Sequence, residues 1–200
     1  MKYAITPRLF ISKIFAVILL PGIIVTGNIY ETGSLLSLIL ELLGYSMLFA
    51  AAIGRAWSSA YISGKKSKEL VAYGPYSLTR NPLYFFSFLG YAGAGLAFKS
   101  LSLTLGMTIL FFLTHWKTIM DEENGNKVRF EKDYPEYSAK VPRFIPSFGK
   151  LINPSISAFY PVPFSRAILG CSYIAYIFMA ARIIEWCQSN SILPVLLRLP

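Results

Sequence analysis

Two polar stretches interrupt a strongly apolar chain, and both contain side chains that could hold a small molecule. Residues 74–84 read Gly-Pro-Tyr-Ser-Leu-Thr-Arg-Asn-Pro-Leu-Tyr and lead directly into an apolar run. Residues 121–123 read Asp-Glu-Glu and follow another apolar run. Charged groups at membrane depth are costly and usually mark a functional site. The two stretches together predict a small-molecule cofactor pocket at a membrane surface.

The first stretch has the pattern of a turn followed by the start of a helix. Gly74 and Pro75 are typical turn residues, one free in its backbone angles and one fixed in φ. Asn81 fits a helix N-cap, and Pro82 fits the first helical position. The unpaired N–H groups of a helix start suit a carboxylate or a phosphate. An ordinary cap on a transmembrane helix would give the same pattern.

The acidic stretch lies where an apolar helix is expected to end. Lys117 and Asp121 are four residues apart and share a helix face. Three acids at a helix C-terminus oppose the helix dipole, and a bound cation or a hydroxyl-bearing ligand would relieve that. The alternative is a solvated helix end with a weak surface ion pair. His115, the only histidine, is more typical of a packed or interfacial side chain than of a catalyst.

The composition places the chain in a membrane. Hydrophobic residues make up 54% of it and charged residues only 14%, against roughly 25% charged in soluble domains. The mean hydropathy is +0.51. Cys171 and Cys187 do not suggest a disulfide framework, and no Cys/His spacing predicts a metal site.

Apolar runs predict an all-α, polytopic fold with about five transmembrane helices. The link Lys99-Ser100 is so short that the helices on either side should form an antiparallel hairpin. In the last run, Arg182 and Glu185 could pair with each other or contact other helices. The runs are about 9–29, 35–56, 82–98, 101–119 and 166–186.

The basic residues set the expected orientation. They concentrate in the N-terminal segment and in the second and fourth connections, and basic loops stay cytoplasmic. This predicts a cytoplasmic N-terminus, a C-terminus on the opposite side, and a pocket facing the cytoplasm. The net charge of +9 then reflects topology and anionic lipid headgroups, so no nucleic-acid partner is expected. Nothing in the sequence indicates an oligomeric state.

The motifs resemble those of the isoprenylcysteine carboxyl methyltransferase and phospholipid methyltransferase superfamily. The resemblance covers roughly residues 60–150. It rests on Gly-Pro-Tyr-x-x-x-Arg-Asn-Pro-x-Tyr at 74–84, Glu-Glu at 122–123, Phe130, Tyr134, Tyr137 and Val-Pro-Arg-Phe-Ile-Pro at 141–146. The chain would then be one membrane domain over 1–200, with an N-terminal helical hairpin (1–57), a methyltransferase core (58–150) and a C-terminal segment with the last span (151–200).

The resemblance implies a membrane enzyme that uses S-adenosylmethionine to methylate a lipophilic small molecule or lipid-modified substrate that enters from the bilayer. Lys117, Arg80 or Arg143 could hold a carboxylate acceptor, whereas an amine acceptor needs a base such as Glu122 or Glu123. The cofactor-contacting residues it implies are Lys68, Glu69, Leu70, Val71, Tyr76, Asn81, Pro82, Leu83, Tyr84, Asp121, Glu122 and Glu123.

Three positions depart from the family pattern. The family often has His where this chain has Asn81, and an amide cannot titrate. Asn126 replaces a usual Leu, and Glu131 replaces a usual Gly. Two other readings stay open: an NADPH-dependent reductase resembling the steroid 5-alpha-reductases, whose phosphates Arg80, Arg129 and Arg143 could bind, and a non-catalytic membrane scaffold.

Overall fold

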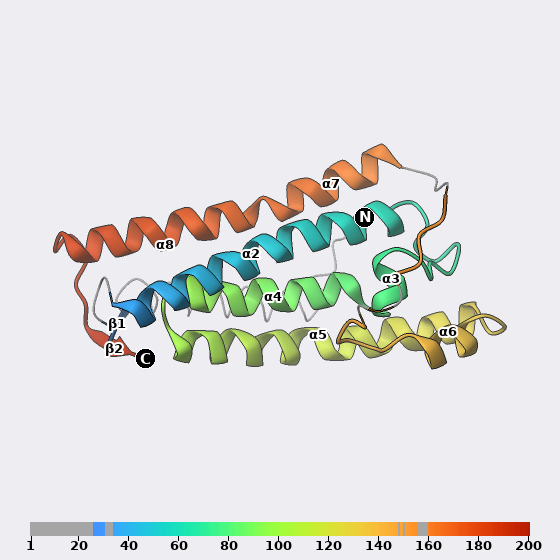
Figure 1. Cartoon of the computed structure of the whole chain (residues 1–200), viewed down its shortest axis with the longest axis horizontal. Helices are drawn as coiled ribbons and strands as arrows, with labels where there is room; N and C mark the ends of the chain where they lie inside the picture. The colour runs from blue at the N-terminus through green and yellow to red at the C-terminus, as the bar shows by residue number, and fades with distance from the viewer. Residues whose placement is uncertain (1–25, 31–33, 148, 150, 156–159) are drawn as a thin grey trace, which may run out of the picture. The chain divides into compact units, whose positions relative to one another are not determined.

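The computed structural model describes residues 26–30, 34–147, 149, 151–155 and 160–200. The chain divides into two compact units. Unit 1 contains residues 1–47, 91–116 and 175–200, and unit 2 contains residues 48–90 and 117–174. Figure 1 labels helices α2 (Leu35–Ile62), α4 (Pro82–Ala97) and α5 (Leu101–Arg129). By their residue numbers, each of these helices contributes to both units.

The described part of the chain is mostly helical, as predicted. Two of its helices, α2 and α5, are long and apolar enough to cross a membrane. Helix α4 has 16 residues, and at 1.5 Å per residue it is about 24 Å long, shorter than a bilayer core of about 30 Å. Most of the apolar run expected at 9–29 lies outside the described residues, so five spans remain a prediction.

In unit 1, a tight turn joins α4 to α5. The N–H of Lys99 donates to Leu96 O at 2.8 Å, and Lys99 adopts a left-handed backbone with φ 55. A Cβ on Gly95 would lie 2.4 Å from the Thr104 backbone, so only glycine allows this approach. The close contact across the turn confirms the predicted antiparallel hairpin.

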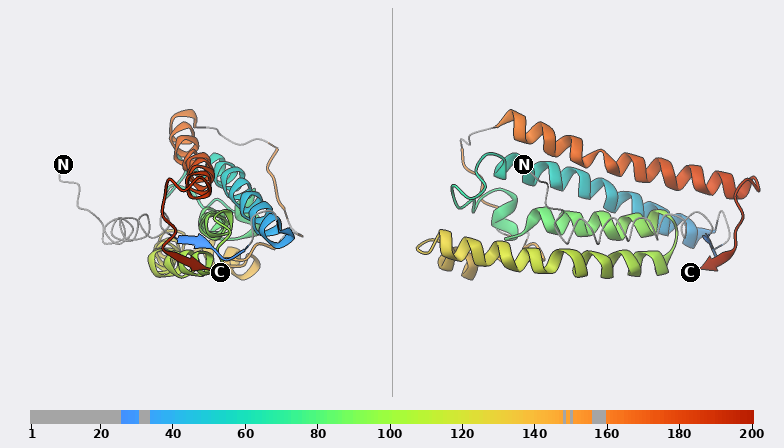
Figure 2. Two further views of the ribbon diagram at one scale, coloured as in Figure 1. Left: turned by 90° about the vertical axis from the view of Figure 1, so that its left-hand side faces the viewer. Right: turned by 180° about the vertical axis from the view of Figure 1, so that it is seen from behind.

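Unit 1 also contains a small sheet that the all-α prediction missed. Strand β1 (Thr26–Asn28) pairs in parallel with β2 (Leu197–Leu199), with Gly27 opposite Arg198 (Figure 2). The apolar run expected to be helical to residue 29 is therefore a strand at residues 26–28. Such short apolar segments fit either structure, and the choice depends on a partner distant in sequence.

Four charged side chains meet in unit 1. Lys99 forms ion pairs with Glu41 of α2 and Glu185 of α8 (Tyr173–Ser189), and Arg182 forms ion pairs with the same two acids. Lys99 is only 5% exposed. Both predictions for Arg182 and Glu185 are confirmed, since they pair with each other and also contact another helix.

The last apolar run is interrupted. Instead of one helix over 166–186, α7 (Pro161–Cys171) ends before Ser172 and α8 begins at Tyr173. The Ser172 N–H and hydroxyl both donate to Leu169 O, at 3.2 and 2.7 Å. This i to i−3 pairing replaces the helical i to i−4 pattern at the break. Cys171 and Cys187 are free thiols.

Unit 2 contains two short helices that hold the polar stretches in place. Helix α3 (Pro75–Leu78) occupies the connection between α2 and α4, and α6 (Tyr134–Lys140) follows the end of α5 (Figure 1). The Tyr137 hydroxyl of α6 donates to Tyr76 O of α3 at 2.8 Å. The two helices thereby connect the segments that were singled out in the sequence.

Candidate functional site

The glycine-proline turn starts the site. Gly74 has φ 60 and ψ −136, a backbone conformation that residues other than glycine rarely adopt. A Cβ at this position would come 2.3 Å from the Tyr61 ring. Pro75 then begins α3, all four residues of which are buried. The predicted turn at Gly74-Pro75 is confirmed.

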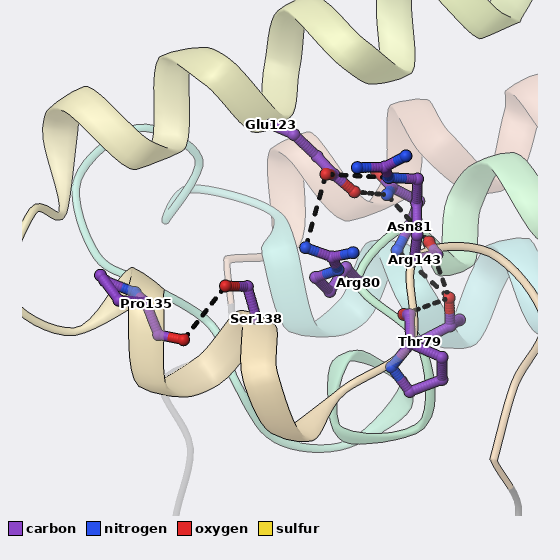
Figure 3. A network of polar contacts seen from close by, with 8 residues as sticks. Thr79, Arg80, Asn81, Glu123, Pro135, Ser138 and Arg143 are labelled. Atoms are coloured by element: carbon purple, nitrogen blue, oxygen red, sulfur yellow. Dashed lines mark hydrogen bonds and ion pairs between the residues drawn. The ribbon is translucent and has the colours of Figure 1, made fainter.

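A strap formed by residues 141–147 closes over this turn. The Arg80 N–H donates to Pro142 O at 2.8 Å, and the Ser147 N–H donates to Leu78 O at 2.9 Å. The Thr79 hydroxyl lies 3.1 Å from Phe144 O and 3.2 Å from Arg143 O. These bonds place Arg143 of the strap beside the start of α4 (Figure 3).

Glu123 is the centre of a buried polar network (Figure 3). It is 2% exposed. Its Oε1 accepts from Asn81 Nδ2 at 2.8 Å, and its Oε2 accepts from Arg143 Nε at 3.1 Å. Arg80 Nη1 lies 3.5 Å from the same Oε2. A buried carboxylate requires such partners. Glu123 therefore links α5 to the start of α4 and to the strap.

Asn81 is held by the same network. Its Nδ2 donates to Glu123 Oε1 and, at 3.0 Å, to Arg143 O, so both amide hydrogens are used. Helix α4 begins at Pro82, as predicted, and Asn81 O accepts the N–H groups of Tyr84 and Phe85. Asn81 therefore caps the helix through its backbone, while its side chain serves the network.

A cavity of about 360 Å³ lies in unit 2, between the two polar stretches. This volume falls within the roughly 300–1,000 Å³ of small-molecule sites. Tyr84, from the first polar stretch, and Glu122, from the second, both line it. The lining residues are Ile62, Lys66, Ser67, Glu69, Leu70, Val71, Tyr76, Arg80, Asn81, Pro82, Leu83, Tyr84, Thr118, Asp121, Glu122, Gly125, Asn126, Arg129, Phe130 and Tyr137.

Most residues expected to contact a cofactor line this cavity. Two do not: Lys68 is exposed on the turn after α2, and Glu123 lies in the buried network. Of the residues expected to act on the substrate, Arg80 and Glu122 line the cavity, whereas Lys117 is exposed and does not. Those that line it are Glu69, Leu70, Val71, Tyr76, Asn81, Pro82, Leu83, Tyr84, Asp121, Glu122 and Arg80.

The acidic stretch is not at a helix end, which corrects the dipole argument. Helix α5 continues to Arg129 and carries Lys127 and Arg129 in its last turn, where cations are favourable. The acids lie more than one turn earlier. The energetic cost of the Glu123 charge comes from its burial. Glu122 is of interest because it lines the cavity.

Two tyrosines of the cavity wall are held in the neutral form. Burial raises the pKa of Tyr76 well above its ordinary value, and nearby Tyr137 and Glu122 add to the shift. Burial also raises the pKa of Tyr137, with Tyr134 and Glu123 contributing in the same direction. Both phenols therefore present O–H groups rather than phenolates near neutral pH.

Sequence reasoning missed several parts of the wall. Lys66 and Ser67 come from a turn that was treated only as a basic loop, and Thr118 and Gly125 lie on α5. The i, i+3, i+4, i+7 spacing of Thr118, Asp121, Glu122 and Gly125 places them on one helix face. That spacing was a usable signal, since two of the four residues were already singled out.

The geometry defines a class of protein: it is mostly helical, two of its described helices are long and apolar enough to cross a membrane, and side chains of two polar turns and one helix face line a cavity of small-molecule size. Residues 32–132 match the family described as phospholipid methyltransferase. The chain belongs to this family, which is part of the isoprenylcysteine carboxyl methyltransferase-like superfamily. Its members are membrane methyltransferases that generally use S-adenosylmethionine. The resemblance in the motifs is confirmed.

Two curated relatives are similar over most of the chain. The nickel-cobalt-cadmium resistance protein NccN of Alcaligenes xylosoxydans xylosoxydans is 29% identical over 86% of this chain and 83% of its own length. The cobalt-zinc-cadmium resistance protein CzcN of Cupriavidus metallidurans is 33% identical over 71% of this chain and 65% of its own length. No solved structure matches significantly.

Proposed function

We propose that this protein transfers the methyl group of S-adenosylmethionine to a lipophilic acceptor at a membrane surface. The observation that carries the proposal is the cavity, which joins Tyr84 at the start of α4 to Glu122 on α5. Family membership supports the reaction class. The bilayer supplies the acceptor, because the chain is built of apolar helices.

We assign the cavity's charges by the chemistry of the donor. Asp121 and Glu122 are suited to the donor's cationic and hydroxyl groups, and the positive end of the α4 dipole is suited to its carboxylate. Arg80 lies on the wall with a long 3.5 Å contact to Glu123. Arg80 is thus placed to hold a second carboxylate, that of the acceptor.

The reaction is an in-line displacement at the methyl carbon. The acceptor's lone pair forms the new bond, the carbon–sulfur bond breaks, and its electron pair stays on sulfur, which loses its positive charge. Holding the reactants in line can contribute about 7–11 kcal/mol. A carboxylate acceptor needs no base, whereas an amine must first lose a proton, for which Glu122 is the candidate base among the carboxylates of the wall.

Asn81 gives the cavity no titratable group at its position. Its two amide hydrogens are bound to Glu123 and to Arg143 O, so it positions the buried network instead of moving a proton. The reductase alternative is weakened, because Arg143 is directed to Glu123 and does not line the cavity. Lys117 as a substrate anchor stays a prediction.

We further propose that the cavity faces the cytoplasm. The basic residues of the second and fourth connections favour this side, and the same rule predicts five spans and a cytoplasmic N-terminus. Labelling single cysteines placed at positions 68 and 140 in sealed vesicles tests the orientation. Access from the cytoplasmic side alone is expected at both positions.

The test of function is binding followed by transfer. The full chain in detergent is titrated with S-adenosylmethionine, and separately with NADPH, alongside Glu122→Gln. We expect the wild type to bind only the methyl donor and Glu122→Gln to bind it at least several-fold more weakly, with Glu131→Gln on the nearby exposed loop unchanged. Transfer of a labelled methyl group to membrane lipid extracts then identifies the acceptor. Absence of donor binding in the wild type would refute the proposal.

A further inference from the structure

Two neighbouring lysines on the turn after α2 have different environments. Lys65 is 5% exposed, and its Nζ donates to the Tyr73 hydroxyl at 2.6 Å and lies 3.4 Å from Glu69. Burial lowers the pKa of Lys65, but the Tyr73 hydrogen bond and the Glu69 charge outweigh it, so the pKa is raised. Lys65 is thus a fixed cation that holds the turn together.

Lys66 reaches the other way, across the cavity. Its Nζ lies 2.8 Å from Glu122 Oε1, and both residues line the cavity. Lys66 belongs to the turn after α2, whereas Glu122 belongs to α5. Gly64 and Ser67 adopt φ values of 77 and 66, which bend this turn on both sides of the lysine pair. The ion pair therefore bridges two walls of the cavity.

This bridge is weak enough to be displaced. The Lys66 side chain is 68% exposed and that of Glu122 is 36% exposed. Solvated pairs of this kind contribute little to stability and are screened by salt. A cationic ligand entering the cavity can replace the ammonium group at little cost, because one ion pair is exchanged for another.

We propose that Lys66 is a specificity-determining residue, which neutralises Glu122 in the empty cavity and yields it only to a ligand that brings its own positive charge. The inference rests on the proposed function, in which the methyl donor carries a sulfonium and an ammonium group. A neutral or anionic nucleoside cannot form an ion pair with Glu122. It must either leave Glu122 paired with Lys66 or leave the Glu122 carboxylate without a cationic partner. Lys66 thereby competes with cationic ligands for Glu122 and sets how strongly the cavity prefers them over neutral nucleosides of similar shape.

The experiment compares Lys66→Ala with Lys140→Ala in the full chain in detergent. Lys140 pairs with Glu136 at 2.6 Å on an exposed face of unit 2, so the control removes the same charge from the same kind of pair away from the cavity. We expect Lys66→Ala to bind S-adenosylmethionine about 2- to 5-fold more tightly, the size of an exposed ion pair. Lys140→Ala should match the wild type.

Ionic strength gives a second readout. The wild type exchanges one ion pair for another, whereas Lys66→Ala forms a new one, so its donor affinity should fall more steeply with salt. S-adenosylhomocysteine, which keeps the ammonium but lacks the sulfonium, identifies the group that replaces Lys66. If Lys66→Ala binds both ligands more tightly than the wild type does, the ammonium group replaces Lys66 at Glu122. If it binds only S-adenosylmethionine more tightly, the sulfonium replaces it. Equal affinities in all three proteins, or weaker binding by Lys66→Ala, would overturn the proposal.

A readout without ligand separates this inference from the proposed function. Hydrogen exchange over residues 62–71 should be faster in Lys66→Ala and Glu122→Gln than in the wild type, and unchanged in Lys140→Ala. If the wild type binds no donor but this pattern holds, the methyltransferase proposal fails and the bridge stands. Unchanged exchange in Lys66→Ala would show that Lys66 and Glu122 are not paired before a ligand binds, which overturns the inference.

Discussion

Glu122 and Glu123 are adjacent in sequence, yet their side chains do different work. Glu123 is enclosed by Asn81, Arg80 and Arg143, while Glu122 lies on the cavity wall with one exposed partner, Lys66. A helix separates neighbouring side chains by about 100°, so one acid faces inward to the network and the other faces the cavity. We therefore propose that stability and ligand binding are divided between these two consecutive residues.

This division predicts that two matched substitutions change stability by very different amounts. Glu123→Gln leaves two arginines without their carboxylate and should lower the free energy of unfolding by on the order of 3 kcal/mol. Glu122→Gln should change it by less than about 1 kcal/mol, because its ion pair is solvated. Thermal unfolding of both variants in detergent measures the difference. An equally stable Glu123→Gln would contradict the structural role given to the network.

The buried tyrosines make a prediction about alkaline pH. The pKa of Tyr137 is raised above its ordinary value of 10.0 in the folded protein, so the folded state holds this proton more tightly than the unfolded chain. Its contribution is therefore complete below pH 10 and is lost as pH rises above that value. Unfolding temperatures measured from pH 8 to 11 should fall above pH 10, and Tyr137→Phe should reduce that fall. An unaltered slope in Tyr137→Phe would argue against the buried phenol.

At the scale of elements, the site depends on two short helices and a strap. Helix α3 is one turn long and cannot be stable alone. It is fixed by Tyr137 of α6, by the strap bonded to Leu78 and Arg80, and by Ile152, whose N–H donates to Ser77 Oγ at 3.0 Å. The cavity wall at Tyr76 therefore follows from contacts made by residues distant in sequence.

Gly74 is the position where this arrangement is most restricted. Gly74→Ala would place a Cβ 2.3 Å from the Tyr61 ring at a backbone conformation that only glycine adopts readily. We expect a loss of about 1–3 kcal/mol and weaker donor binding, because α3 would shift. Gly106→Ala, with nothing within 4 Å of its Cβ, is the control and should be no less stable than the wild type. Unfolding curves and donor titrations of both variants provide the check.

At the scale of the whole molecule, the chain carries a second cluster of charged side chains, none of which lines the cavity. The ion pairs of Lys99 and Arg182 with Glu41 and Glu185 lie in unit 1 and include no cavity residue. They join the α4–α5 turn, α2 and α8. Because Lys99 is buried, its charge carries a desolvation cost that the two acids offset.

Replacing this lysine should separate folding from binding. Lys99→Met leaves two acids with a single arginine, and we expect a loss on the order of 3 kcal/mol. The donor affinity of the folded protein should be unchanged, because no residue of the set lines the cavity. Lys140→Met, which breaks an exposed pair, is the control for stability. A large loss of donor affinity in folded Lys99→Met would show that the two sets are coupled.

The sequence by itself determined the features that depend on local order. Long apolar runs indicate membrane helices, Asn81-Pro82 indicates the start of α4, and the short link at Lys99 indicates a hairpin, because each follows from propensity and chain connectivity. The motif residues also pointed to the cavity and to the family. Local pattern could not separate Glu122 from Glu123, however, since both fit the same motif.

Tertiary structure alone decided which of those residues face the cavity and which hold it in place. Glu123, Asn81 and Arg143 form a network because a strap returns from beyond α5, and Lys66 reaches Glu122 because a turn after α2 bends toward α5. The same holds for the strand at residues 26–28, which exists only through its partner at 197–199. Burial and pairing are properties of distant segments brought together, and no local periodicity encodes them.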